Sequence, residues 1–159
     1  MGVTTTTNSA VTYVPIATQT LGSSASSITF NSIPQTYTDL IMILNGGLAN
    51  AVYAIGLQLN GDTGTNYSTT TMEATPSSVV SQQQATRTKG YLLGFQGPVN
   101  PYQITTHFLN YSNTTTYKTV LSNSRSAANA GVYVNLWRST SAITSINLLT
   151  DGTTFNSGF

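Results

Sequence analysis

The chain has 159 residues, the size of one domain, and its five basic and four acidic residues leave a formal net charge of +1. Only 6% of the residues are charged, against roughly a quarter in an ordinary soluble domain, while 39% are hydrophobic. The charges stand singly, so the clustered Lys and Arg that bind nucleic acid or anionic lipid are missing, and the lack of Cys excludes disulfides and zinc-thiolate sites.

The N-terminal stretch MGVTTTTNSAV has neither the basic head nor the apolar centre of a secretory signal. Its Thr-rich residues can bury very little surface, so we expect residues 1–12 to form a flexible arm. We expect residues 13–159 to form a single domain.

Alternation of apolar with polar residues, in stretches rich in Thr, Val, Ile, Tyr and Phe, predicts strands along the domain. The predicted strands cover residues 27–30, 37–45, 52–60, 66–73, 90–95, 103–111, 116–122, 132–138 and 143–149. Residues 75–89 have little apolar content and are typical of a long surface loop, with or without a short helix. About eight to nine strands at this spacing predict an all-β, single-domain antiparallel β-sandwich, jelly-roll-like, with no helix longer than about two turns.

Two of these strands lead to expectations about burial. The stretch 37–45 is the most apolar, and we expect both of its faces to be buried along part of its length. In 132–138 the residues Val132, Val134 and Leu136 share one parity and are predicted to face the core. Trp137 has the other parity, which leaves it at a rim or an interface.

Interface candidates follow from residue type. Trp and Arg are over-represented among the residues that dominate binding energy, so Trp137 and Arg138 are candidates. Arg87 and Lys89 join them because they stand in the predicted 75–89 loop, and loops commonly carry contacts.

Catalytic and metal-binding chemistry have little support. His107 is the single His, no strand-turn-helix elbow surrounds any Ser, and four acids make a carboxylate pair improbable. The stretch Asn60–Gly64 has oxygen ligands at alternate positions, as calcium loops do, but lacks their acidic density and terminal Glu, so a turn is favoured over a cation site. We therefore predict a protein that is not an enzyme, with no catalytic residue, no cofactor and no metal.

Five stretches of the sequence resemble a family of tailed-phage structural proteins that is common among phages of cyanobacteria and other aquatic bacteria. They are IATQTL (16–21), SIPQTYTDL (32–40), LNGDTGTNYS (59–68), NYSNTTTYKT (110–119) and LWRSTSAITSI (136–146). They cover most of the chain outside residues 70–105, and IPQTYTDL together with LWRST is specific because long ordered strings rarely recur by chance.

The resemblance implies a virion structural protein, assembled in the host bacterial cytoplasm. A capsid decoration or cement protein that binds and stabilises the major capsid protein shell is the first expectation. A tail, baseplate or fibre component, with exposed Tyr residues that bind host-surface carbohydrate, is the alternative. In either role the arm of residues 1–12 would become ordered on the particle.

Similar proteins continue beyond the final Gly158-Phe159 with a further Ser/Thr-rich apolar strand, whereas this sequence stops there. We therefore expect residues 143–159 to leave an open sheet edge that a partner covers. Because a net charge near zero gives little repulsion between copies, we expect a homo-oligomer, a trimer, with Trp137 or residues 75–89 near the contact. The expected partners are virion proteins rather than nucleic acid or a membrane.

Overall fold

The computed structural model describes residues 13–49, 54–93 and 101–159, which form ten strands and no helix. Residues 1–12, the predicted arm, lie outside the described residues. The strands are β1 (Ser27–Phe30), β2 (Leu40–Gly46), β3 (Ile55–Leu59), β4 (Tyr67–Ala74), β5 (Val79–Arg87), β6 (Gly90–Leu93), β7 (Tyr102–Phe108), β8 (Lys118–Arg125), β9 (Ala130–Trp137) and β10 (Ile146–Thr150). In the same ranges, no helix is both long and apolar enough to cross a membrane.

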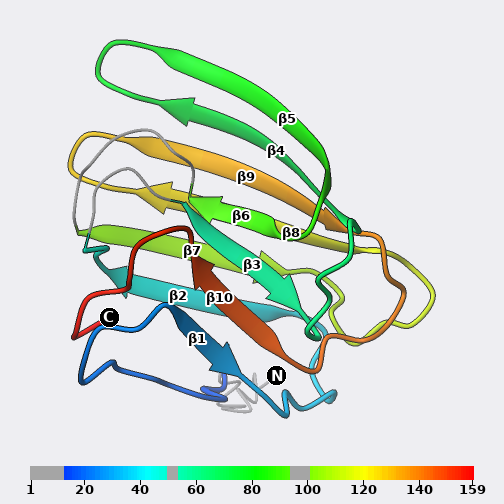
Figure 1. The fold of residues 1–159 in the computed structure, drawn as a ribbon. Helices are drawn as coiled ribbons and strands as arrows, with labels where there is room; N and C mark the ends of the chain where they lie inside the picture. Colours follow the sequence, from blue (N-terminus) through cyan, green and yellow to red (C-terminus); the bar gives the residue numbers. More distant parts are fainter. Residues whose placement is uncertain (1–12, 50–53, 94–100) are drawn as a thin grey trace, which may run out of the picture.

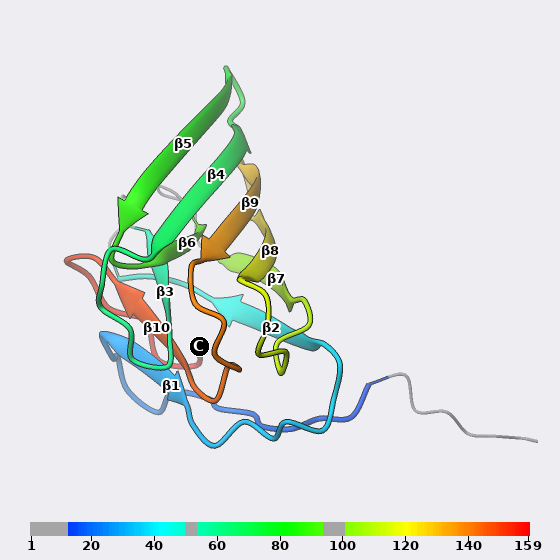
Figure 2. The ribbon, with the colours of Figure 1, turned by 90° about the vertical axis from the view of Figure 1, so that its right-hand side faces the viewer.

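The strands form two antiparallel sheets that pack face to face, as Figures 1 and 2 show. The smaller sheet has the order β1-β10-β3-β6, and the larger has the order β2-β7-β8-β9-β4-β5. Without the β8–β9 hairpin, which is inserted between β7 and β4, each sheet has four strands and the chain crosses between sheets in the order of a jelly roll. The predicted jelly-roll-like β-sandwich is therefore confirmed.

The prediction of a surface loop at residues 75–89 is wrong for most of that range, because Val79–Arg87 is β5, the edge strand of the larger sheet. Its hydrogen bonds to β4 hold it in place, and Thr75 to Ser78 form the turn of the hairpin. An edge strand that projects beyond the opposite sheet buries little of either face, so it needs no apolar alternation (Figure 2). The sequence pattern therefore gave no sign of it.

The expectation that 37–45 is buried on both faces is also wrong. The strand begins at Leu40 and lies at the other edge of the larger sheet, where Leu40 and Leu44 face the core. Ile43 points to the outer face and is 62% exposed. No layer covers that face among the residues described.

Asn135 joins the two sheets through the core. Its Oδ1 accepts hydrogen bonds from the Thr69 hydroxyl of β4 (2.6 Å) and from the backbone N–H of Tyr91 in β6 (2.8 Å), and its Nδ2 donates to the Tyr91 carbonyl (2.9 Å). The side chain thus binds β6 as a neighbouring strand would. Gly90 makes the approach possible, since a Cβ there would lie 2.6 Å from Asn135 Oδ1.

The C-terminal residues close one end of the sandwich. Phe155 is fully buried and its backbone exchanges hydrogen bonds with Ala25, while Phe159 packs at 4.6 Å from the Phe155 ring. β10 itself is paired on both sides, with β1 and with β3. The expected open edge at residues 143–159 is therefore wrong for this strand, and the open edges of the larger sheet belong to β2 and β5.

Candidate interaction surfaces

Trp137 lies in the core, in a row of four residues that crosses the larger sheet. In the strand register Lys118 pairs with Trp137, Trp137 with Tyr67, and Tyr67 with Arg87. The Trp137 ring is 3% exposed and stacks on Tyr67, with 6.4 Å between ring centroids and 18° between planes. Its predicted place at a rim or interface is therefore wrong, and the buried parity of β9 is Tyr133, Asn135 and Trp137.

The turn after β3 is built around the carboxylate of Asp62. Oδ1 accepts from the backbone N–H of Gly64 (2.8 Å), and Oδ2 accepts from the Asn66 amide (2.9 Å) and from Trp137 Nε1–H (2.7 Å). Partial burial acts to raise the pKa of Asp62, but these three hydrogen bonds outweigh it and the pKa lies below its ordinary value. The predicted turn at Asn60–Gly64 is therefore confirmed, and N–H donors bind both oxygens of its carboxylate.

Replacing Asp62 by alanine should lower the free energy of unfolding at pH 7 by about 2 kcal/mol, because Trp137 Nε1–H loses its acceptor. A depressed pKa means that the part of this stabilisation that depends on the charged carboxylate is complete above the unfolded-state pKa and is lost as pH falls through the lower folded-state pKa. Urea unfolding from pH 7 to pH 2 should show the gap between wild type and variant narrowing below pH 3.8, the ordinary value. Thr63→Ala in the same turn is the control, and equal effects of the two changes would contradict the assignment.

Arg87 and Lys89 come together around Tyr91. The Arg87 guanidinium donates to the Tyr91 hydroxyl (2.8 Å) and lies 5.6 Å from the ring centroid, while Lys89 Nζ lies 6.0 Å from the same centroid and forms an ion pair with Asp151. A bulge opposite Ser68, with Thr86 at a φ of 54°, interrupts the β4–β5 register just before Arg87. Bulges of this kind redirect the side chains beside them.

Arg138 and Lys118 have structural contacts. The backbone N–H of Arg138 donates to the Asn66 carbonyl (2.8 Å), which extends the β4–β9 pairing by one step. Lys118 is buried, its Nζ donates to the backbone oxygens of Thr116 (2.8 Å) and Thr140 (3.2 Å), and burial lowers its pKa. The structure thus groups Arg87 with Lys89 and buries Trp137 in the core, while Arg138, whose side chain is half-buried, stays an interface candidate from the sequence.

The prediction that Val132, Val134 and Leu136 face the core is wrong. Val132 and Val134 are 48% and 41% exposed on the outer face of the larger sheet, and Leu136 is half-buried there. Val132 pairs with Met72, which is 61% exposed, and Val134 pairs with the half-buried Leu121. We call Met72, Leu121, Val132 and Val134 the outer-face patch. Sequence reasoning missed Met72 and Leu121.

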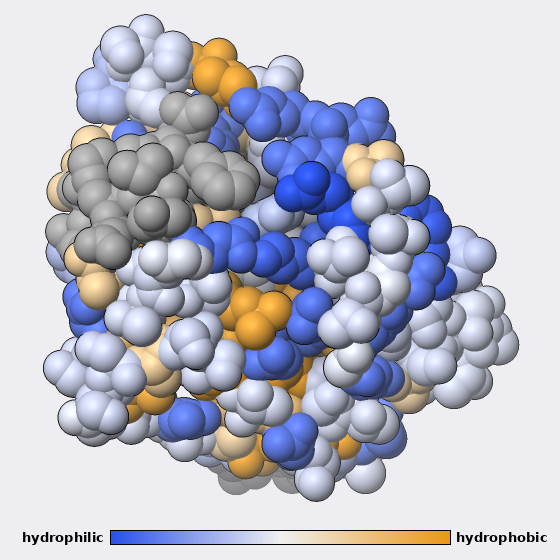
Figure 3. Space-filling view, viewed as in Figure 1, coloured by the Kyte–Doolittle hydropathy of each residue, from blue (hydrophilic) through white to orange (hydrophobic). Residues whose placement is uncertain are grey.

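The opposite face of the molecule is different in character. Figure 3 shows the side on which the smaller sheet lies in front, and its apolar residues form small groups separated by hydrophilic ones. An exposed run of apolar side chains over three adjacent strands, β4, β9 and β8, therefore distinguishes the outer face of the larger sheet. Contiguous apolar surface of this kind commonly marks a contact with another protein.

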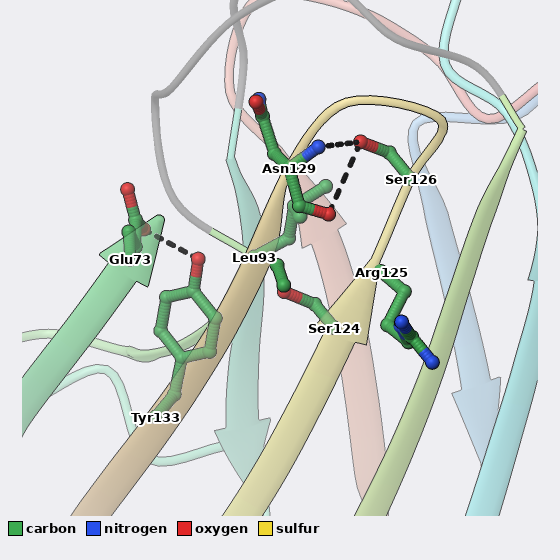
Figure 4. Close-up of a pocket in the computed structure, with 8 residues that line it drawn as sticks. Glu73, Leu93, Ser124, Arg125, Ser126, Asn129 and Tyr133 are labelled. Atoms are coloured by element: carbon green, nitrogen blue, oxygen red, sulfur yellow. Dashed lines mark hydrogen bonds between the residues drawn. The ribbon is translucent and has the colours of Figure 1, made fainter. Parts of the chain in front are cut away.

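A small pocket lies between the ends of β4, β8 and β9 (Figure 4). It is lined in part by Glu73, Arg125, Asn129 and Tyr133, and the Tyr133 hydroxyl donates to the Glu73 carboxylate. Its volume of about 10 Å³ is room for about one water molecule, far below the size of a ligand site. It carries no argument for a bound substrate.

The groups that could support catalysis are dispersed. His107 lies on the outer face of β7, and its partners across the ladder are Ile41 and Leu121. Each acid accepts from a separate donor; the pairs are Asp39 with Asn110 N, Asp62 with Trp137, Glu73 with Tyr133, and Asp151 with Lys89. The described residues bring together no group of three or more His, Cys, Asp or Glu that could hold a metal ion.

Comparisons with known protein families, curated proteins and solved structures gave no match. The resemblance drawn from the sequence therefore stays a prediction. The outer-face patch and the open edge of β5 are the exposed surfaces suited to contact with another protein.

Proposed function

We propose that this chain is a structural protein of a bacteriophage virion, a capsid decoration protein that binds and stabilises the shell of the major capsid protein. Two lines of support are the resemblance to tailed-phage structural proteins and the jelly-roll sandwich, an architecture that recurs in viral shells. The observation that carries the proposal is the outer-face patch on the larger sheet. Its apolar side chains are exposed over three adjacent strands of a chain with few charges.

The patch is suited to a flat, dry contact. Val132 and Met72 are direct cross-strand partners, as are Val134 and Leu121, so the four side chains form one continuous area. Each contact of this kind contributes modestly, but many copies on a shell add their contributions and resist expansion from within. No catalytic step and no cofactor is needed for that work.

The charges favour protein partners over nucleic acid or membrane. Of the five basic residues, Lys118 is buried and Lys89 is paired with Asp151. Neutralising several phosphates needs clustered cations on one face, and this chain has no such cluster in its sequence. We propose the major capsid protein as the partner and a homotrimer as the assembled form, with virions as its location.

The number of copies in purified virions separates this role from its alternative. A decoration protein should be present in hundreds of copies, in a fixed ratio to the major capsid protein on a stained gel. A tail, baseplate or fibre component that binds host-surface carbohydrate should be present in a few to a few dozen copies. A low copy number would overturn the decoration role and favour the alternative.

A patch variant tests the surface itself. Val134→Lys should weaken binding to shells that lack this protein by at least about tenfold, because a charge would have to be desolvated in the contact. Ser27→Lys, an exposed change on β1 of the opposite sheet, is the matched control and should bind as wild type does. Equal binding by both variants would rule out the patch as the capsid contact.

A further inference from the structure

Residues 13–20 form an extended segment that runs along the outside of the sandwich before Leu21 enters the core. Their side chains are all exposed, among them Tyr13 at 66%, Val14 at 51% and Ile16 at 42%. No backbone hydrogen bond joins this segment to another described residue. Large apolar side chains on an extended backbone without a partner are the properties of a strand that completes a sheet elsewhere.

The free edge of β5 offers such a sheet. In the β4–β5 hairpin the Thr75 N–H donates to the Ser78 carbonyl, which fixes the alternation of hydrogen-bonded pairs along the ladder. Val80, Gln82 and Gln84 therefore point their backbone groups at β4. The N–H and C=O groups of Val79, Ser81 and Gln83 point away from the sheet. This edge has no Lys and no Pro, the residues with which edge strands usually prevent pairing.

The two features lie at opposite ends of the molecule. In Figures 1 and 2 the blue segment that holds residues 13–20 runs along one end, beyond β1, and β5 forms the other end. The segment therefore lies far from the β5 edge of its own chain. A contact between them joins one copy to the next.

Pro15 fixes how the segment could pair. Because proline has no N–H, the backbone of Pro15 must face away from the partner strand. Alternation along the strand then points the N–H and C=O groups of Val14, Ile16 and Thr18 toward that strand. In antiparallel pairing these residues stand opposite Val79, Ser81 and Gln83, whose side chains lie on the same face as Met72 and Val132. Val14 and Ile16 would thus extend the apolar outer face of the larger sheet, where Val79 is 71% exposed.

We propose that residues 13–20 of one copy add as a seventh, antiparallel strand to the β5 edge of a neighbouring copy. Such a contact is heterologous, since the two copies use different surfaces, and it produces a closed ring when the rotation between copies closes. It rests on the self-association part of the proposed function and supplies the contact that a homotrimer needs. It does not depend on where the protein sits in a virion.

Proline substitutions in the full chain test the contact from both sides. Ile16→Pro/Thr18→Pro removes two N–H groups that face β5, whereas Ala17→Pro/Gln19→Pro, with the parity of Pro15, keeps them. On the edge, Gln83→Pro removes an outward N–H that β4 does not use, and Gln83→Ala keeps it. The segment positions carry no backbone hydrogen bond to another described residue, and the backbone of Gln83 points away from β4, so circular dichroism and urea midpoints should match wild type.

Light scattering and analytical ultracentrifugation should find wild type and both controls oligomeric. Each blocked variant alone should be monomeric at concentrations where wild type is oligomeric. The dissociation constant should rise about a hundredfold for Ile16→Pro/Thr18→Pro, which loses two backbone hydrogen bonds, and about tenfold for Gln83→Pro, which loses one. A mixture of the two blocked variants should give dimers, because the edge-blocked copy still has its segment and the segment-blocked copy still has its edge.

Three results would overturn the contact. A segment-blocked variant that stays oligomeric would point instead to β5 pairing with β5 of a sister copy, and a mixture that stays monomeric would exclude the complementary pairing. Either result leaves the proposed self-association and the virion role standing. A wild type that is monomeric at its highest soluble concentration would overturn the contact and the homotrimer together, and the virion role would still rest on the copy number.

Discussion

Replacing Asn135 by leucine should lower the free energy of unfolding by about 4 kcal/mol. Leucine has the same branched skeleton as asparagine but can neither accept nor donate. The Thr69 hydroxyl and the N–H and C=O of Tyr91 would each remain buried without their present partner. Leaving such a group unpaired costs about 1–3 kcal/mol, and three are affected at once.

Asn123→Leu is the matched control, because Asn123 is an exposed asparagine on the outer face of the neighbouring strand β8. Its change should stay within about 0.5 kcal/mol, as is usual on a surface. Urea unfolding measures both, and amide hydrogen exchange at Tyr91 should accelerate in Asn135→Leu alone. If the two leucine variants unfold at the same urea concentration, Asn135 does not hold the sheets together.

Replacing Phe155 by alanine should cost about 3–5 kcal/mol of unfolding free energy, the range for a fully buried aromatic ring. The loss reaches both sheets, because Phe155 forms β-bridges with Ala25, just before β1, and with Leu48, just after β2. Phe159 would also lose the ring against which it packs. The cavity therefore opens where the ends of β1 and β2 meet.

Tyr117→Ala removes an aromatic ring that is 55% exposed and serves as the control for Phe155→Ala. Thermal unfolding followed by circular dichroism should separate the two variants clearly, with Tyr117→Ala close to wild type. A Phe155→Ala protein as stable as Tyr117→Ala would mean that the C-terminal segment contributes little to the sandwich.

The sequence predicted the strands well where they line the core, and it failed where the larger sheet extends past the smaller one. In β9 either of two alternating sets of side chains could face the core. One set contains Val132 and Val134, the other contains Tyr133, Asn135 and Trp137, and hydropathy favoured the aliphatic set. The core at this end of the larger sheet is instead built from aromatic rings and hydrogen-bonded polar groups. Tyr133, Asn135 and Trp137 are therefore the side chains that are buried there. Nothing in the pattern of one strand carries that information.

Which of the candidate residues come together depends on strand pairing, and the local sequence does not encode that pairing. Arg87 and Lys89 meet at Tyr91 because a bulge interrupts the β4–β5 ladder just before Arg87 and the chain then turns into β6. The acceptor for Trp137 Nε1–H is Asp62, 75 residues away. Gly61, Asp62 and Gly64 did predict the turn, but its hydrogen bond to the core depends on how β4 and β9 pair.

The pairing of β1 with β10 sets the order of events during synthesis. Thr29 and Asn147 bond across this pair although 118 residues separate them. At about 5–20 residues per second, a ribosome adds Asn147 about 6–24 s after it adds Thr29. The hairpins of the larger sheet can form meanwhile, but β1 and one edge of β3 wait unpaired on a nascent chain with few charges. Chaperone occupancy should therefore be highest in that interval, and slow translation of residues 30–146 should lower the yield of soluble protein.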